Sequence, residues 1–187
     1  MFLSAREVSF QPAPKRLSDS VVLTHWRSST SIGIMNEEEI ITWLKAIPGV
    51  VVETVAAQGD APEIAWGDSF AYDAASAALP ADHRWPFATV ITKDYPGFDE
   101  SSQLNRHGVF RVNVNVGRDR FTQLVGYPPS EHKQRTPAVD PATKDVIIPH
   151  PQYGQQGWLA VVSPGVNTSA LLRELLGEAH DRAASRL

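Results

Sequence analysis

The chain has 187 residues, of which 42% are hydrophobic and 20% are charged, and its formal net charge is −4. This composition is typical of a globular protein and excludes a collagen-like, coiled-coil or wholly disordered chain. The sequence contains no cysteine, which excludes disulfides, thiol nucleophiles and thiolate metal sites. No apolar run approaches the roughly 20 residues that a membrane span requires.

Residues 1–34 differ from the rest of the chain. They show no sustained hydrophobic periodicity and carry a net charge of +2, whereas residues 35–187 carry −6. Asn36 and three glutamates follow, which predicts the start of a helix, because asparagine caps helices and acidic residues suit their positive end. We therefore predict an N-terminal extension over 1–34, outside the core, and a single domain over 35–187. The alternative, in which residues 1–34 add a strand or helix to that domain, stays open.

The first half of this domain predicts one helix and three extended segments. Apolar residues recur at helical spacing over 36–47, and Pro48-Gly49 follows them, so the helix ends there. The segment 74–84 is small and polar and predicts a loop with one helical turn. The extended segments are rich in β-branched or aromatic residues, and they cover 50–55, 64–72 with an interruption at Gly67-Asp68, and 87–92.

The strand predicted over 110–116 alternates strictly. Its apolar residues face one way, and its polar residues, Arg111, Asn113 and Asn115, face the other. Further along, the sequence predicts a short helix over 119–125, strands over 146–148 and 158–162, and a final helix capped by Asn167 or Thr168. Strand follows strand without long helices between them. The fold class is therefore predicted as α+β, with a mainly antiparallel sheet and helices packed on one face.

Two parts of the predicted sheet offer candidate ligand contacts. Arg111 and Asn113 lie two residues apart on one side of a strand, where they can recognise a carboxylate, phosphate or amide group through oriented hydrogen bonds. The alternative is a solvated sheet face, which antiparallel sheets often have. In the aromatic segment 64–73, Tyr72 is a candidate ligand contact, because a buried tyrosine hydroxyl needs a polar partner. Core packing is the alternative for this segment.

The loop that begins at Pro149 is a third candidate. Prolines fix the backbone on both sides of His150, and Tyr153 and Trp158 follow within the same loop and the next strand. A histidine held in this way can act as a general base or as a hydrogen-bond donor near neutral pH. It can equally be a structural histidine that bonds a backbone carbonyl. The acids that could orient it are Asp68, Asp94 and Asp99, and their spacing does not choose among them.

Metal and cofactor motifs are missing from the sequence. Its six histidines are scattered, without a His-x-His pair or a His-Glu-x-x-His helix. Glycine-rich phosphate loops and a Gly-x-Ser-x-Gly elbow do not occur either. We therefore expect no metal and no cofactor.

Four segments carry a family resemblance. Gly67-Asp68-Ser69-Phe70-Ala71-Tyr72-Asp73 comes first, and Trp85-Pro86-Phe87-Ala88-Thr89-Val90, Gly108-Val109-Phe110-Arg111-Val112-Asn113 and Pro149-His150-Pro151-Gln152-Tyr153-Gly154 follow. In this order they resemble an uncharacterised family of actinobacterial proteins, DUF6194, over roughly residues 35–186. The order of elements is more distantly similar to the MmcQ/YjbR-like proteins. That resemblance implies a YjbR-like α+β fold, and it links the chain to antibiotic gene clusters and, by fold, to DNA binding. It implies no catalytic residue.

These observations lead to three hypotheses of function. The first is a cytoplasmic small-molecule-binding protein, either an enzyme or a resistance protein of specialised (antibiotic) metabolism. Its site would be a polar-aromatic pocket on the open sheet face, lined by Tyr72, Arg111, Asn113, His150, Tyr153 and Trp158. The second is a DNA-binding or regulatory module, which the net charge disfavours. The third is a structural or interaction domain.

The first hypothesis makes a geometric prediction. The ring of His150 should lie within about 8–10 Å of Arg111 or Asn113, so that one small ligand touches both. We expect neither Arg111 nor His150 to belong to the apolar core, so that replacing either one costs little stability. We expect a small-molecule partner, no nucleic acid and no membrane, and we leave pairing into a homodimer open.

Overall fold

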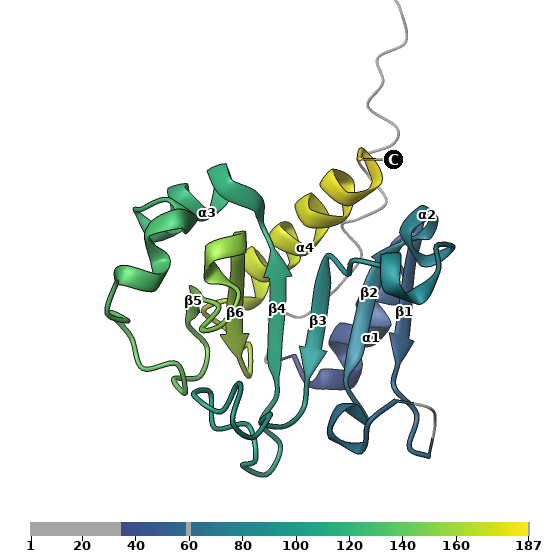
Figure 1. Cartoon of the computed structure of the whole chain (residues 1–187), viewed down its shortest axis with the longest axis horizontal. Helices are drawn as coiled ribbons and strands as arrows, with labels where there is room; N and C mark the ends of the chain where they lie inside the picture. The colour runs from purple at the N-terminus through teal and green to yellow at the C-terminus, as the bar shows by residue number, and fades with distance from the viewer. Residues whose placement is uncertain (1–34, 59–60, 187) are drawn as a thin grey trace, which may run out of the picture. The chain divides into compact units, whose positions relative to one another are not determined.

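The structure is a computed structural model and describes residues 35–58 and 61–186 (Figure 1). The extension predicted over 1–34 lies outside the described residues. Six strands form one sheet in the order β1-β2-β3-β4-β6-β5, and neighbouring strands run antiparallel. The strands are β1 (Val50–Thr54), β2 (Ser69–Asp73), β3 (Ala88–Ile91), β4 (Arg111–Asn115), β5 (Ile147–Pro149) and β6 (Trp158–Val162).

Helices α1 and α4 lie on the same face of the sheet, behind it in the view of Figure 1. Buried leucines of α4 and Ile40 and Leu44 of α1 share one apolar cluster with Val112 and Val114 of β4. The predicted α+β class, with a mainly antiparallel sheet and helices packed on one face, is therefore confirmed. The α-helices are α1 (Glu37–Lys45), α2 (Ala74–Ala77), α3 (Gly117–Val125) and α4 (Ser169–Ala184), and the 3₁₀ helices are η1 (Glu63–Ala65), η2 (Ala81–His83), η3 (Pro129–Gln134) and η4 (Gly154–Gln156).

The start of α1 matches its sequence signal. The Asn36 side chain accepts a hydrogen bond from the backbone N–H of Glu39 at 2.9 Å, and the Glu39 carboxylate accepts one from the backbone N–H of Asn36 at 2.9 Å. This reciprocal arrangement is a capping box, and it satisfies two backbone donors that the helix itself leaves free. The predicted helix start is thus confirmed.

The start of α4 is held differently from the prediction. Thr168 is the N-cap residue, but its side chain does not bond to the first turn of the helix. Instead, the carboxylate of Asp145 accepts hydrogen bonds from the backbone N–H groups of Gly165, Asn167 and Thr168 and from the Thr168 hydroxyl. A side chain that precedes β5 therefore fixes the turn that leads into α4.

The long extended segment predicted over 64–72 forms only in its second part. Residues 63–65 make a 3₁₀ turn, and the chain reverses at Gly67, whose φ is +88°, before β2 begins. Because glycine adopts this left-handed conformation without steric penalty, the interruption noted in the sequence becomes a turn. Trp66 therefore does not continue the face of β2, and its indole N–H donates to the carbonyl of Ala61.

The alternation predicted for β4 is confirmed, but its polar face is not open. Val112 and Val114 pack under the helices, and Arg111 and Asn113 point to the other face. Both polar residues are buried, and Arg111 is only 1% exposed. The segments around Asp99 and His150 cover this face, because both contact Arg111 directly. The expectation that this face of the sheet is open is therefore corrected, because two loops cover Arg111 and Asn113.

Across residues 35–58 and 61–186, none of the helices combines the length and the apolar character needed to span a lipid bilayer.

Candidate functional site

A cavity of about 690 Å³ lies against the polar face of β4 and reaches the C-terminal end of α4. Its volume falls in the range of roughly 300–1,000 Å³ that is typical of small-molecule sites. The sheet register explains why residues far apart in the sequence line it together. Ile91, Arg111 and Val162 are direct neighbours across three strands, and so are Thr89, Asn113 and Ala160. Residues opposite each other in a sheet share one face.

Arg111 is the charged residue at the base of this cavity. Its guanidinium forms a bidentate ion pair with Asp99, in which Nη1–Oδ1 is 3.1 Å and Nη2–Oδ2 is 2.5 Å. Nη1 also donates a hydrogen bond to the Ser102 hydroxyl at 2.8 Å. Asp99 therefore binds Arg111, and among the described residues none of the three acids expected to orient His150 hydrogen-bonds to it. Asp68 and Asp94 instead bind the backbone N–H groups of Thr92 and Leu104.

The burial of this ion pair corrects the expectation that Arg111 can be removed at little cost. Without Arg111, the carboxylate of Asp99 would remain buried without a counter-charge. Breaking a buried pair by removing one partner costs about 3–5 kcal/mol. Arg111 is therefore a structural residue of the loop that carries Asp99 as well as a candidate ligand contact.

His150 and Arg111 meet in the cavity. Nε2 of His150 lies 3.3 Å from Nη2 of Arg111, so the predicted proximity of the two side chains is confirmed. Nδ1 of His150 accepts hydrogen bonds from the backbone N–H groups of Gln152 at 3.1 Å and Tyr153 at 3.2 Å. Since Nδ1 accepts, the neutral ring carries its proton on Nε2. Nε2 and Nη2 are then both donors, and neither can accept from the other.

The protonation state of His150 follows from its surroundings. Burial lowers the pKa of His150 well below its ordinary value, and the positive charge of Arg111 and the nearby ring of His132 lower it further. The ring is therefore neutral at pH 7. Taking up a proton would create a second buried cation beside Arg111, which argues against a general base and favours a hydrogen-bond donor, the other role expected of His150.

Three buried polar atoms of the lining residues have no hydrogen-bond partner within the described part of the chain. They are Nε of Arg111 and Nε of Arg182, both donors, and Oδ1 of Asn113, an acceptor. The amide nitrogen of Asn113 donates to the Thr89 hydroxyl at 2.9 Å, which fixes the orientation of the side chain. A buried polar group without a partner costs about 1–3 kcal/mol. The residues that line the cavity thus carry donors and an acceptor that no group of the described chain satisfies.

Aromatic side chains surround these polar groups. Phe98 is 53% exposed and Tyr153 is 39% exposed, and their ring centroids lie 6.2 Å apart. The Gln152 side chain donates to the carbonyl of Phe98 at 2.6 Å, which ties the two loops together. Trp158 of β6 lies opposite Asn115 of β4. Tyr153 and Trp158, which the sequence analysis predicted as site residues, both line the cavity.

Tyr72 is the predicted site residue that the structure does not bring to this cavity. It lies opposite Val51 of the edge strand β1, while its neighbour on the same face, Phe70, does line the cavity. Burial and the nearby carboxylate of Glu53 raise the pKa of Tyr72, although Arg84 opposes them. Tyr95 is the tyrosine in the lining, and its hydroxyl donates to Asp68 at 2.5 Å.

Sequence reasoning missed several lining residues. Asp99 appeared only as one of three acids, and Ser102, which bonds Arg111, carried no recognisable motif. Arg182 and Arg186 line the far end of the cavity, although the sequence shows only that they belong to the last helical segment. Among residues 35–58 and 61–186, no three histidine, aspartate or glutamate side chains come close enough together to hold a metal ion.

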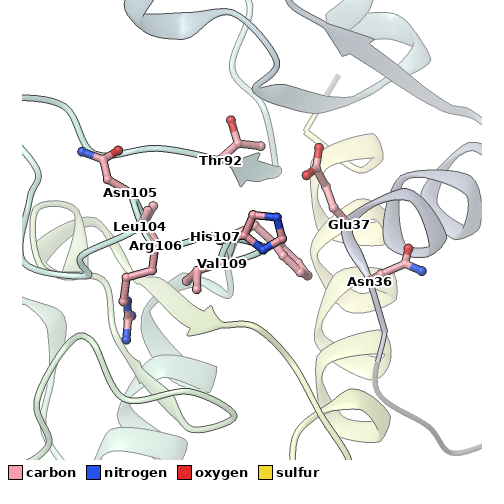
Figure 2. Close-up of a pocket in the computed structure, with 10 residues that line it drawn as sticks. Asn36, Glu37, Thr92, Leu104, Asn105, Arg106, His107 and Val109 are labelled. Atoms are coloured by element: carbon pink, nitrogen blue, oxygen red, sulfur yellow. The ribbon is translucent and has the colours of Figure 1, made fainter.

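A second, smaller cavity of about 390 Å³ lies next to the start of α1. Figure 2 shows Glu37 on one side of it and Asn105 on the other, with the His107 ring between them. Burial raises the pKa of Glu37, and the charge of Asp68 raises it further. Asn105 and His107 are exposed. Because this cavity lacks the buried, unsatisfied groups of the larger one, the larger cavity is the candidate functional site.

The comparisons with known proteins give one match. Residues 35–187 match the model of a protein family described as "Family of unknown function (DUF6194)". No curated protein and no solved structure matches the chain.

Proposed function

The chain belongs to the DUF6194 family, whose description assigns no activity, and we propose from its own residues that it binds a small organic molecule in the cavity lined by Arg111, Asn113 and His150. One observation carries this proposal. Buried donors and a buried acceptor that have no partner in the described chain converge in a cavity with aromatic walls.

The polar groups define what the ligand must offer. Nε2 of His150 and Nη2 of Arg111 lie side by side as donors, and an oxygen atom of a ligand can accept from both. Oδ1 of Asn113 needs an N–H or O–H group. An amide, a lactam or a similar donor–acceptor edge supplies both kinds of atom. If Arg111 and Asn113 served packing alone, their remaining polar atoms would be expected to have partners, since the large majority of buried polar groups do.

The walls define the rest of the ligand. Phe98, Tyr153 and Trp158 supply aromatic surface around the polar groups, which suits a ligand with a planar or apolar body. Because the resemblance to MmcQ/YjbR-like proteins points to antibiotic gene clusters, antibiotics and their precursors are the first natural ligands to test. The proposal concerns binding, and it assigns no reaction to the site.

A fluorescence titration tests the proposal. N-phenyl-1-naphthylamine is an apolar probe that brightens when it leaves water, and we expect it to bind the full chain saturably at one site. Phe98→Ser and Tyr153→Ser each remove an exposed ring at the rim, and each should weaken probe binding about three- to tenfold. Val166→Ser is the matched control, because Val166 is an apolar residue with 60% exposure and lies outside the lining. Absence of saturable binding, or equal affinities of all variants, would overturn the proposal.

A further inference from the structure

We propose that the ligand of this cavity is an anion, and that Arg182 and Arg186 bind its oxyanion at the end of the cavity beside the C-terminus of α4. This inference rests on the proposed function and adds a chemical class to it. The oxyanion can be a carboxylate, a sulfonate or a phosphate.

The hydrogen bonds of Arg182 within the described chain all go to neutral acceptors. The guanidinium donates to the backbone carbonyl of Val116 at 3.0 Å and to the backbone carbonyl of Asn115, both of which are neutral acceptors. Its Nε is buried and has no partner in the described chain. Within residues 35–58 and 61–186, no carboxylate comes within ion-pair distance of Arg182. Glu178, which is close in sequence, pairs with Arg120 instead.

Arg186 adds a second cation to the same end of the cavity, and it forms no ion pair with any described residue. It follows Arg182 by four residues, lines the cavity and is exposed. Burial lowers the pKa of Arg182 and the positive charge of Arg186 lowers it further, although the charge of Glu178 opposes them, so the two guanidinium groups repel each other. Cations near a helix C-terminus are stabilised by the helix dipole, which explains basic residues in this last turn. The dipole does not require both of them to line one cavity.

The charge balance of the cavity also favours an anionic ligand. Arg111 is neutralised by Asp99, and Asp99 is the only acidic residue in the described lining. Burial keeps His150 neutral, so two net positive charges remain, both at the Arg182 end. A cavity of one sign, partly closed off from water, favours a ligand of the opposite sign. Arginine also matches the planar geometry of oxyanions through paired N–H donors.

The sheet register gives the ligand an orientation. Arg182 bonds to the backbone of Asn115, and Asn115 lies opposite Trp158 in the sheet, two residues along β4 from Asn113. Trp158 therefore lies at the same end of β4 as the arginines, and Arg111 lies at the other end of that strand. We assign the oxyanion to the arginine end, the apolar body to the surface of Trp158, and the amide-like group to Asn113 and His150.

Two matched probes test this assignment. 1-Anilinonaphthalene-8-sulfonate and N-phenyl-1-naphthylamine share the same ring system, and only the first carries a sulfonate. We expect the sulfonate probe to bind the full chain about tenfold more tightly at low salt, and we expect added salt to reduce this preference. Competition by 1-naphthoate and by 1-naphthyl phosphate then distinguishes a carboxylate ligand from a phosphate ligand.

The decisive variant is Arg186→Gln, because Arg186 is exposed and its loss leaves the bonds between Arg182 and β4 in place. It should remove most of the preference for the sulfonate probe, because the affinity for that probe should fall much more than the affinity for the neutral probe. Arg118→Gln is the control, since it removes the same charge from an exposed arginine outside the cavity. Equal effects of the two variants, or equal affinities of the two probes, would overturn the inference and leave the proposed function standing. If neither probe binds saturably, both proposals fail.

Discussion

Nη2 of Arg111 and Nε2 of His150 lie 3.3 Å apart, although 39 positions separate the two residues in the chain. Both atoms carry hydrogens, so the contact is a meeting of two donors and contributes no hydrogen bond of its own. Asp99 on one side and the backbone N–H groups of Gln152 and Tyr153 on the other hold the two side chains in this arrangement. The stability of the loops and the readiness of the site for an acceptor atom therefore depend on the same contacts.

The ion pair between Arg111 and Asp99 predicts a non-additive pair of substitutions. Arg111→Met should lower the free energy of unfolding by about 3–5 kcal/mol, because it leaves the Asp99 carboxylate buried without a counter-charge. The double variant Arg111→Met, Asp99→Leu removes both charges and should lose less than Arg111→Met alone. Urea unfolding measures all three chains. A loss below about 1 kcal/mol for Arg111→Met would show that the pair behaves like an exposed one.

His150 predicts a loss of stability in mild acid. The pKa of His150 is lowered in the folded chain, first by burial and then by Arg111 and His132, and unfolding returns it towards 6.5. Below that pH the unfolded chain binds a proton that the folded chain does not, so stability should fall as the pH is lowered from 7 to 5. Above pH 7 this group should have no effect on stability.

Urea midpoints at pH 7 and pH 5 measure this dependence. His150→Gln should show a smaller loss than the parent chain, because it removes one of the groups responsible. Part of the loss should remain, since burial also lowers the pKa of His132. His83→Gln, which replaces an exposed histidine outside the cavity, is the control and should behave like the parent chain. Equal losses for His150→Gln and the parent chain would contradict the assignment.

Asp145 predicts a second contribution to stability that depends on pH, this time from a carboxylate. Burial raises the pKa of Asp145, but hydrogen bonds from Thr168, Asn167 and Gly165 lower this pKa overall. Asp145→Ala should lower the free energy of unfolding at pH 7 by about 1–2 kcal/mol, as loss of a helix cap does. When folding lowers the pKa of a carboxylate, the carboxylate stabilises the fold at pH values above its pKa in the unfolded chain. This stabilisation is lost as the pH falls through its pKa in the folded chain. The difference between the variant and the parent chain should therefore shrink below pH 4, which thermal melts at pH 7 and pH 3 measure.

The distribution of charge predicts poor binding to duplex DNA. Residues 35–187 carry a net charge of −6, and the arginines at positions 182 and 186 line a cavity in place of a basic surface stripe. Because DNA affinity depends on clustered cations that release counterions, an anisotropy titration of the full chain at physiological salt should show no saturable binding below about 10⁻⁶ M. Salt-sensitive nanomolar binding would instead support the DNA-binding hypothesis.

Local signals in the sequence were sufficient to predict the start of α1 and the side-chain directions of β4. The alternation of β4 placed Arg111 and Asn113 opposite the core, and the Asn36 signal located the start of α1. Both patterns depend on neighbours within a few residues, which the sequence displays directly. The prolines on both sides of His150 likewise predicted a stiff loop at this position, and the structure places His150 beside Arg111.

Contacts between distant segments could not be predicted in the same way. Tyr72 and Phe70 share a face of β2 and both lie beside β1, but only Phe70 also pairs with β3, opposite Thr89, because the β2–β3 register ends at Ala71. The choice of Asp99 among three acids depends on how the loop before β4 folds over the sheet. That loop lacks regular structure, so its path is set by tertiary packing.

The hydrogen bond between the Gln152 side chain and the carbonyl of Phe98 has a consequence for motion. It joins the loop that carries Asp99 to the loop that carries His150, so loosening one loop removes a restraint on the other. Fluctuations of the two loops should therefore be correlated, and a ligand that contacts one loop should reduce the motion of both. Amide hydrogen exchange then slows together around residues 98 and 152 upon binding, across a separation of 54 positions in the chain.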